Sequence, residues 1–410
     1  MTEALRSLTP RGKGAIAAGI LLVILAIAWG QRDLLAIGVL LIALTCAAAA
    51  LLARGRLQLR IEREVTPSHV PVGGSAEVTL SVTNLSSRRT GTVLISEALP
   101  VTLGAPVRRV LEDTGAQRPR VTTYAVQAIT RGRYELGPLT TTALDPFGLV
   151  RITRTHRSTA SLLVVPRVEE LADGDLRADH WGRGEGAAMT LAARGDEDVI
   201  PREYRQGDDL RRIHWRASAR ADDLMVRREE TPWTRRATVL LDLRSCAHGG
   251  DGPRSSLEVA LSAAASASVH LLRRGWSVRL VSTDGRVLMP TRAGAEGEGE
   301  ALTTLALAAE WPGRDVAVAG AGDGLIVAVI GSDPAIASAL GGRLARAPGQ
   351  TGLALVLDSA AWFASDALPC AEVVDDLARA GWNAAGLTAR PSGIADAWHA
   401  ATAVGVRSGR

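Results

Sequence analysis

The chain has 410 residues, of which 47% are hydrophobic and 22% are charged. It is long enough for two or three domains and apolar enough to bury sizeable cores, which excludes a disordered tail or a miniprotein held by disulfides. Basic and acidic residues number 47 and 43, so the net charge of +4 also excludes a polycation that coats nucleic acid.

Lysine and cysteine usage exclude two further classes. Lys13 is the only lysine of the chain, whereas a Walker-type phosphate loop needs a lysine after its glycines. The three cysteines, Cys46, Cys246 and Cys370, lie far apart and form no Cys-x-x-Cys pair. This pattern argues against a disulfide framework and a structural zinc site, and it favours a reducing compartment.

Two apolar stretches near the N-terminus predict a membrane anchor in residues 1–60. Residues 14–30 carry no charge, and residues 34–53 follow after a gap of three residues. Each stretch is about long enough to cross a hydrocarbon core of roughly 30 Å. A cleaved signal peptide is the alternative for the first stretch, but a second span follows at once. We therefore expect two N-terminal transmembrane helices that form a hairpin.

The basic residues around these stretches predict their orientation. The turn between the two stretches has one basic residue, Arg32, which lies beside Asp33. Both outer flanks carry more basic residues: Arg6, Arg11 and Lys13 before the first stretch, and Arg54, Arg56, Arg60 and Arg63 after the second. An excess of basic residues marks cytoplasmic flanks. We expect a multi-pass protein of the plasma membrane, with both termini and the soluble domains in the cytoplasm.

Residues 61–165 have the pattern of an all-β, sandwich-like domain. Apolar and polar residues alternate from Val78 to Thr83, and similar short runs recur at 92–95, 122–129, 137–144 and 161–165 between Gly, Pro and Asn-Ser turns. Period-two alternation between turn clusters is typical of half-buried strands, and a small antiparallel sandwich is the expected architecture.

Residues 166–236 are predicted to form a linker and an arginine-rich cassette. Within 201–236, ten arginines accompany seven acidic residues and three aromatic residues. Arginine forms two parallel hydrogen bonds to a carboxylate and stacks on indole rings, so this composition suits a folded polar network as well as an anion-binding surface. Both interpretations stay open at this point.

The cassette carries a motif that resembles a known family. The motif consists of Tyr204, Arg205, Gly207, Asp208, Asp209, Arg211, Ile213, Trp215, Ser218 and Arg220, followed by Leu224 to Arg227. Together with RGRYELGPL at 131–139 and DPFGL at 145–149, it is similar to the bacterial proteins called domain of unknown function 58. The resemblance implies no agreed activity. It implies a von Willebrand factor A-like C-terminal domain and association with MoxR-type AAA+ ATPases and transglutaminase-like membrane proteins.

The residues of the cassette allow three other interpretations. Asp208, Asp209 and His214 are of the types that ligate a catalytic divalent ion, although the surrounding arginines would more simply neutralise the two acids. Arginines beside Tyr204 and Trp215 also suit single-stranded nucleic acid, but the acidic residues weaken the positive field. We favour an ion-pair network, with the arginines open to a protein partner, and we expect no nucleic acid partner.

From residue 237 to 410, apolar strand-like runs alternate with amphipathic helical stretches. Strands are expected at 237–243, 277–282, 325–330 and 353–357, and helices at 255–274, 298–311, 334–346 and 367–380. This alternation is typical of a doubly wound α/β domain with a mostly parallel sheet. Functional loops of such sheets cluster at the carboxyl ends of the strands.

The first of these loops contains Asp242, Arg244 and Cys246. A von Willebrand A domain that binds a divalent ion has Asp-x-Ser-x-Ser there, so Arg244 and Cys246 stand where the two serines would. A guanidinium repels a cation, and we expect a degenerate site without a metal, in which Asp242 pairs with an arginine or hydrogen-bonds the loop. Cys246 beside His248 could be a reactive thiol, but an inert cysteine is favoured.

No catalytic constellation is visible in the sequence, and no cofactor is expected. We therefore predict a membrane-anchored interaction module that docks a protein partner, with a MoxR-type AAA+ ATPase implied by the resemblance and a role in the assembly or maturation of envelope proteins. The alternative is a metal-dependent hydrolase or nuclease that uses Asp208, Asp209 and His214.

Overall fold

The computed structural model describes residues 7–54, 58–86, 92–111, 117–173, 201–203, 218–219, 224–227, 235–318, 324–344, 351–358, 362, 370–388 and 393–403. The chain divides into two compact units, Met1–Arg167 and Val168–Arg410.

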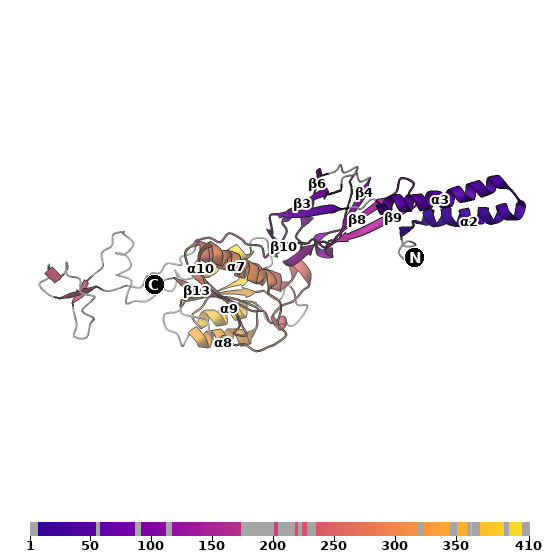
Figure 1. The fold of residues 1–410 in the computed structure, drawn as a ribbon. Helices are drawn as coiled ribbons and strands as arrows, with labels where there is room; N and C mark the ends of the chain where they lie inside the picture. The colour runs from indigo at the N-terminus through magenta and orange to yellow at the C-terminus, as the bar shows by residue number, and fades with distance from the viewer. Residues whose placement is uncertain are drawn as a thin grey trace. The chain divides into compact units, whose positions relative to one another are not determined.

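The first unit begins with the two apolar helices that the sequence predicts, α2 (Pro10–Trp29) and α3 (Arg32–Arg54) (Figure 1). Thr9 caps α2 by accepting a hydrogen bond from the backbone N–H of Gly12, and Gly30 ends the helix in the left-handed conformation. The helices cross at Gly19 and Gly38, where a Cβ atom on either residue would lie within 2.9 Å of the other's carbonyl oxygen. Small residues at a crossing let apolar helices approach closely.

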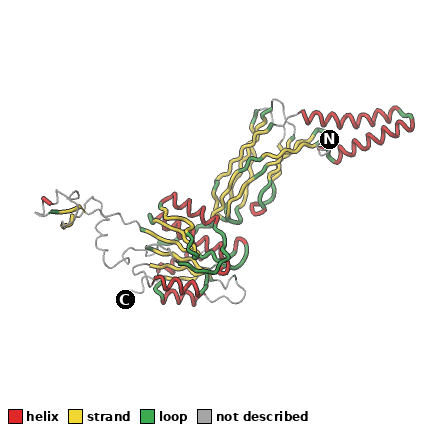
Figure 2. Tube along the Cα trace, turned by 60° about the horizontal axis from the view of Figure 1, so that its bottom comes forward, coloured by secondary structure: helices red, strands yellow, loops and turns green. Residues whose placement is uncertain are grey.

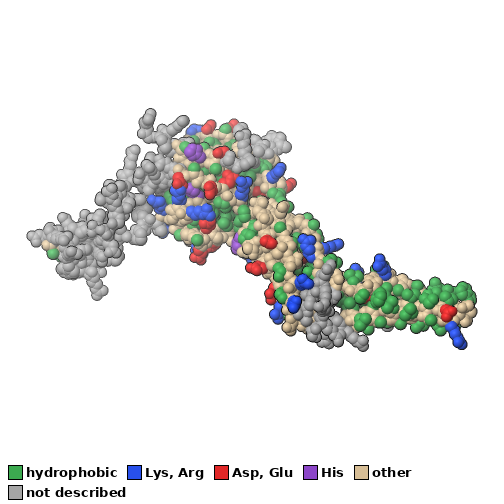
Figure 3. Space-filling model, turned by 90° about the horizontal axis from the view of Figure 1, so that it is seen from above, with side chains coloured by type: hydrophobic (Ala, Val, Ile, Leu, Met, Phe, Trp, Pro, Cys, Tyr) green, Lys and Arg blue, Asp and Glu red, His purple; other side chains and the backbone are tan. Residues whose placement is uncertain are grey.

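Both helices are long and apolar enough, by length and composition, to cross a membrane. Their outer surface is almost entirely hydrophobic (Figure 3). Ile24, Ile27 and Leu40 are 57%, 75% and 64% exposed. A water-soluble protein rarely exposes so large a continuous apolar surface.

The rest of the first unit consists of strands (Figure 2). They are β1 (Leu59–Thr66), β2 (His69–Pro71), β3 (Ser75–Asn84), β4 (Val93–Glu97), β5 (Val107–Leu111), β6 (Pro119–Gln127), β7 (Gly132–Leu136), β8 (Leu139–Leu144), β9 (Arg151–His156) and β10 (Ala160–Val165). They form three sheets, β1-β3-β6, β2-β10-β7 and β5-β4-β8-β9. The inward residues of these sheets share one core, which includes Val78, Leu80, Ile95, Leu139 and Leu162.

Two details differ from the expected antiparallel arrangement. β10 pairs with β2 in parallel, which is possible because most of the unit's chain connects these two strands. The strand expected at 137–144 begins at Leu139 as β8, and β7 precedes it as a separate strand, because Gly137 adopts a φ of 111° and Pro138 follows it. That conformation is strained for any residue but glycine and turns the chain.

The second unit contains a mixed sheet of six strands with helices on both faces (Figure 1). The strands are β13 (Arg236–Leu241), β14 (Ser277–Ser282), β15 (Val287–Arg292), β16 (Leu325–Ile330), β17 (Thr351–Leu357) and β18 (Asn383–Leu387), in the order β15-β14-β13-β16-β17-β18. Only β15, at one edge, is antiparallel to its neighbour. Because helices cover both faces of the sheet, its strands are buried and continuously apolar.

Two hydrophobic cores lie on opposite faces of this sheet. α6 (Ser256–Arg273), α7 (Gly294–Leu307) and α10 (Gly393–Ala403) pack on one face, and α8 (Pro334–Leu344) and α9 (Cys370–Arg379) pack on the other. Side chains of β13 alternate between them, since Val239 and Leu241 join the first core and Leu240 joins the second. Trp398 of α10 is fully buried in the first core and donates a hydrogen bond to the carbonyl of Ala172.

His270 of α6 makes the stability of the second unit depend on pH. Its ring meets the ring of Trp398 edge-on, with centroids 5.4 Å apart, and its buried Nε2 has no hydrogen-bond partner among the described residues. Burial lowers the pKa of His270 below its ordinary value of 6.5. Below pH 6.5 the unfolded chain therefore binds a proton that the folded chain does not, and stability falls as the pH decreases.

A His270→Phe variant is expected to lose less stability than the wild type between pH 7 and pH 5.5, because the phenyl ring keeps the contact with Trp398 and does not titrate. One histidine changes the free energy of unfolding by at most about 1.4 kcal/mol per pH unit. Urea unfolding of the full chain in detergent, followed by tryptophan fluorescence at each pH, measures this difference. His399→Gln, at an exposed position of α10, is the control and keeps the wild-type slope. Equal slopes for His270→Phe and the wild type would contradict the assignment.

Candidate functional site

The sheet of the second unit reverses its strand order at β13. β14 lies on one side of β13 and β16 on the other. The chain reaches β14 through α6 on one face, whereas Val316 and Val318, which precede β16, pack in the core of the opposite face. In such sheets a crevice opens beyond the carboxyl ends of the strands at this point, and ligands bind there. Three residues follow directly or closely on these strand ends: Asp242 after β13, Thr283 after β14 and Asp333 after β16.

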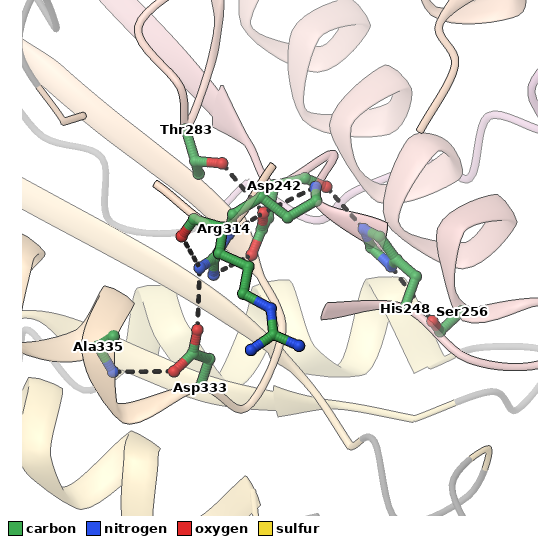
Figure 4. Close-up of polar contacts among 8 residues, drawn as sticks. Asp242, His248, Ser256, Thr283, Arg314, Asp333 and Ala335 are labelled. Carbon is green, nitrogen blue, oxygen red and sulfur yellow. Dashed lines mark hydrogen bonds and ion pairs between the residues drawn. The ribbon is translucent and has the colours of Figure 1, made fainter. Parts of the chain in front are cut away.

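Asp242 and Arg244 form a buried, two-pronged ion pair at the centre of this edge (Figure 4). The Nε and Nη2 atoms of Arg244 donate to Oδ1 and Oδ2 of Asp242, each over 2.9 Å. The backbone N–H of Arg244 also donates to Oδ1 over 3.2 Å. The two side chains are 0% and 2% exposed. Parallel charge-assisted bonds of this kind fix geometry as well as charge.

The remaining partners of this pair come from the loops after β14 and β16 and from the backbone of Arg314. Thr283 donates from Oγ1 to Oδ1 of Asp242 over 3.0 Å. The Nη1 atom of Arg244 lies 2.9 Å from Oδ2 of Asp333 and donates to the carbonyl of Arg314 over 3.3 Å. Asp333 in turn accepts from the backbone N–H of Ala335 over 2.9 Å at the start of α8. The guanidinium itself therefore joins the ends of β13 and β16 and the backbone of Arg314, and Thr283 after β14 is connected to it through Asp242.

His248 secures the loop that carries the pair. Its Nε2 lies 2.7 Å from the carbonyl oxygen of Asp242, and its Nδ1 lies 3.2 Å from Oγ of Ser256. Both ring nitrogens of His248 therefore have partners other than Cys246, which is exposed. The histidine is thus held by the backbone and by α6.

Burial alone would lower the pKa of Arg244, but the hydrogen bonds and charges of Asp242 and Asp333 outweigh it and hold that pKa above its ordinary value. The guanidinium is therefore a permanent cation at neutral pH. Among the described residues, no group of three or more His, Cys, Asp or Glu side chains could hold a metal ion. At this edge, Asp242 and Asp333 are engaged with the guanidinium, with backbone N–H groups and with Thr283.

The structure brings together some predicted site residues and does not describe others. Asp242 and Arg244 form the pair that the sequence left as one of several possibilities, and Cys246 lies in the 3-10 turn that follows. Most of the predicted residues of the cassette lie outside the described residues: Tyr204, Arg205, Gly207, Asp208, Asp209, Arg211, Ile213, His214, Trp215 and Arg220. Ser218 is described and half-buried.

The two ends of the signature are joined by a short strand pair. β11 (Pro201–Glu203) is antiparallel to β12 (Met225–Arg227), with Arg202 opposite Val226. This pairing brings the described residues on the two sides of the signature next to each other.

Thr283, Asp333 and the carbonyl of Arg314 were not predicted from the sequence. The available signal was their position: Thr283 and Asp333 each follow closely on a buried apolar strand, and Asp333 precedes Pro334 at a helix start. Aspartate before an N-terminal proline is typical of a helix cap. Only the strand order shows that these ends converge on Asp242.

Residues 201–329 match the model of a family described as "Protein of unknown function DUF58". The matched segment contains the signature, Asp242, Arg244 and Thr283. A comparison with curated proteins found no match.

Among solved structures, the CARDB domain of the PF1109 protein from Pyrococcus furiosus is 20% identical, with a TM-score of 0.20 over 26% of this chain and 92% of that one. A cohesin module of a family 33 glycoside hydrolase from Clostridium perfringens is 12% identical, with a TM-score of 0.20 over 26% of this chain and 96% of that one. These likenesses are too remote to assign a fold or a function.

Proposed function

We propose that this protein is a membrane-anchored docking module whose soluble parts lie in the cytoplasm and bind a protein partner. The anchor is the α2–α3 hairpin. Its large exposed apolar side chains, such as Ile27 at 75% exposed, are compatible with lipid and costly in water. The basic flanks Arg11 and Lys13, against a turn with Arg32 and Asp33, favour cytoplasmic ends for both helices.

The second unit is proposed to be a von Willebrand factor A-like domain in which an arginine replaces the metal. Support comes from the strand order β15-β14-β13-β16-β17-β18 with one antiparallel edge, and from an aspartate directly after the central strand. A divalent ion in such a site is held by side chains from neighbouring strand ends. Here the guanidinium of Arg244 makes those contacts, to Asp242 and Asp333, so the edge is built without exchangeable metal.

The observation that carries a docking function is this closed ion-pair network at the switch point. Ligand chemistry in α/β sheets takes place at this edge, yet Asp242, Asp333 and His248 there are engaged with Arg244 and with the backbone. An edge that is held rigid in this way, with the exposed Arg314 beside the network, suits recognition of a protein surface. The partner we propose is a MoxR-type AAA+ ATPase, because such ATPases accompany the proteins that the signature resembles, and the assembly or maturation of envelope proteins is the proposed process.

Binding of the full chain, reconstituted in nanodiscs, to the MoxR-type ATPase of the same organism tests this proposal. Biolayer interferometry with ATP is expected to show saturable binding. Arg314→Glu should weaken it at least tenfold, because Arg314 is exposed beside the network at the carboxyl edge of the sheet. Arg379→Glu is the matched control, since Arg379 is 77% exposed at the C-terminal end of α9, where the chain returns to the opposite edge.

Absence of binding, or equal effects of the two charge reversals, would contradict the proposed partner or the proposed surface. Turnover of a substrate by the purified chain, abolished by Asp208→Ala, would replace docking with the hydrolase hypothesis.

A further inference from the structure

The loop after β8 fastens the β-rich part of the first unit to the base of the hairpin. Leu8 forms a bridge with Val150, and the N–H of Thr9 donates to the carbonyl of Leu149 over 3.0 Å. The hydroxyl of Thr9 donates to the carbonyl of Gly148 over 2.6 Å. At Gly12 a Cβ atom would lie 2.1 Å from the carbonyl oxygen of Leu149, so the contact requires glycine.

A buried aspartate shapes this loop, residues 145–150. Asp145 is 5% exposed and accepts from the N–H of Phe147 over 2.9 Å and from that of Val150 over 2.6 Å. Leu149 and Val150 are buried in a cluster with Ala48 and other residues of the two helices. Phe147, by contrast, is 59% exposed. The same turn therefore holds two apolar residues on the hairpin and presents a third outward.

The contacts place Phe147 near the level where the apolar span begins. Thr9 and Gly14 are separated by about 8 Å along a helix axis, and the uncharged stretch starts at Gly14. The headgroup layer of a bilayer is roughly 5–8 Å thick on each side of the hydrocarbon core. If the hairpin spans a bilayer, the loop lies at the headgroups. Phenylalanine side chains on interfacial elements bury at the boundary between headgroups and acyl chains.

Basic side chains gather at the same end of the unit (Figure 3). The basic group, as we name it, consists of exposed residues at the starts of α2, β1, β6 and β9: Arg11, Lys13, Arg60, Arg118, Arg120 and Arg151. The strand register places Arg60 and Pro119 on either side of Thr83, at the end of β3. Among the described acids at this end, Asp145 is buried within its own turn and Glu62 lies farther along β1.

We propose that Phe147 and the basic group form a surface that binds anionic phospholipids of the cytoplasmic leaflet. The phenyl ring inserts among the headgroups, and the guanidinium groups bind lipid phosphates, so that the β-rich part is held against the membrane and not merely tethered to it. Basic residues beside a membrane are attracted to anionic lipid within about a Debye length. The proposal rests on the membrane anchor proposed above.

Spin labels on the full chain test the membrane anchor and the lipid-binding surface separately. In a background with Cys46, Cys246 and Cys370 replaced by serine, nitroxides are attached to Phe147→Cys, to Ile24→Cys on the hairpin and to Thr123→Cys on the exposed side of β6. Collisions with oxygen and with a water-soluble nickel chelate report depth in vesicles of equal phosphatidylglycerol and phosphatidylcholine. We expect label 24 deep in the bilayer, label 147 at the headgroups and label 123 in water.

A label at 147 that is as open to nickel as label 123, while label 24 stays deep, would overturn the lipid-binding surface and leave the anchor intact. A label at 24 that is open to nickel would overturn the anchor itself. The two failures are therefore distinct.

Lipid selectivity tests the basic group. Spin-labelled phosphatidylglycerol is expected to associate severalfold more strongly than spin-labelled phosphatidylcholine with the wild type, and this preference should disappear in Arg118→Gln/Arg120→Gln/Arg151→Gln. The matched control is Arg133→Gln/Arg157→Gln/Arg167→Gln, three exposed arginines outside the basic group, which keeps the preference. Equal loss in both triple variants, or loss of the preference in millimolar inorganic phosphate, would refute specific binding of lipid headgroups at this surface.

Discussion

Replacing Arg244 with alanine is expected to destabilise the second unit by about 3–5 kcal/mol, the usual cost of removing one partner of a buried ion pair. The carboxylate of Asp242 is 0% exposed, so water cannot take the place of the two lost hydrogen bonds of 2.9 Å. Asp333, at 32% exposed, can be rehydrated and contributes less. Urea unfolding followed by tryptophan fluorescence mainly reports this unit, because the first unit has a single tryptophan, Trp29 at the end of α2.

Three further variants distinguish the contribution of burial to this loss of stability from that of charge. Arg273→Ala removes an arginine that is 62% exposed and paired with Glu298 in the same unit, and it should cost about 1 kcal/mol or less. Arg244→Lys keeps the charge but not the planar fork, so an intermediate cost is expected. Asp242→Leu/Arg244→Leu removes both charges and should recover much of the stability lost in Arg244→Ala. Equal costs for Arg244→Ala and Arg273→Ala would contradict the structural role of the pair.

The central strands of the second unit were predictable because burial on both faces leaves an unbroken apolar run. The sequence predicts β14 and β16 at the bounds that the structure has, 277–282 and 325–330. The edge strands were missed. β15 contains Pro290, and β18 reads NAAGL, with little β-branched character. Edge positions tolerate proline and weak strand formers, so their sequences carry a weaker signal.

In the candidate site, contacts between residues close in sequence were predictable, and contacts between distant residues were not. Asp242 and Arg244 share one loop, so their pairing was among the possibilities open from sequence. Thr283 lies 41 residues from Asp242, and Asp333 lies farther still. Their convergence depends on the strand order, which places β14 and β16 on either side of β13. No local pattern encodes that order.

Arg63 has a different role from the one that the sequence predicts. The sequence places it among the basic residues that follow the second apolar helix, yet its side chain is 1% exposed and paired with Glu97 over 2.6 Å. The burial of β1 alternates, and Arg63 lies on the inward side with Ile61 and Val65. An arginine at an inward strand position needs a buried partner. That alternation was the available signal.

The Arg63–Glu97 pair joins all three sheets of the first unit. Arg63 comes from β1, Glu97 ends β4, and the Nη1 of Arg63 donates to the carbonyl of Ser158, just before β10, over 2.8 Å. Tyr124 of β6 donates to Oε2 of Glu97 over 2.6 Å. Burial first, and then the carboxylate of Glu97, raise the pKa of Tyr124 above its ordinary value. The phenol therefore remains a donor at all physiological pH values.

Glu97→Ala should consequently destabilise the first unit by about 3–5 kcal/mol, because it leaves the guanidinium of Arg63 buried without a counter-charge. Tyr124→Phe removes only the neutral donor to the carboxylate and should cost about 1–3 kcal/mol. Hydrogen exchange of the β3 amides, measured by mass spectrometry on the full chain in detergent, follows this unit, which has no tryptophan among residues 61–167. Arg60→Ala, at an exposed position on the same strand, is the control and should leave the exchange unchanged. The variant leaves the apolar core around Val78 and Leu80 intact. Unchanged protection of the β3 amides in Glu97→Ala would therefore show that apolar packing alone holds the sheets together, and would contradict the role of the ion pair.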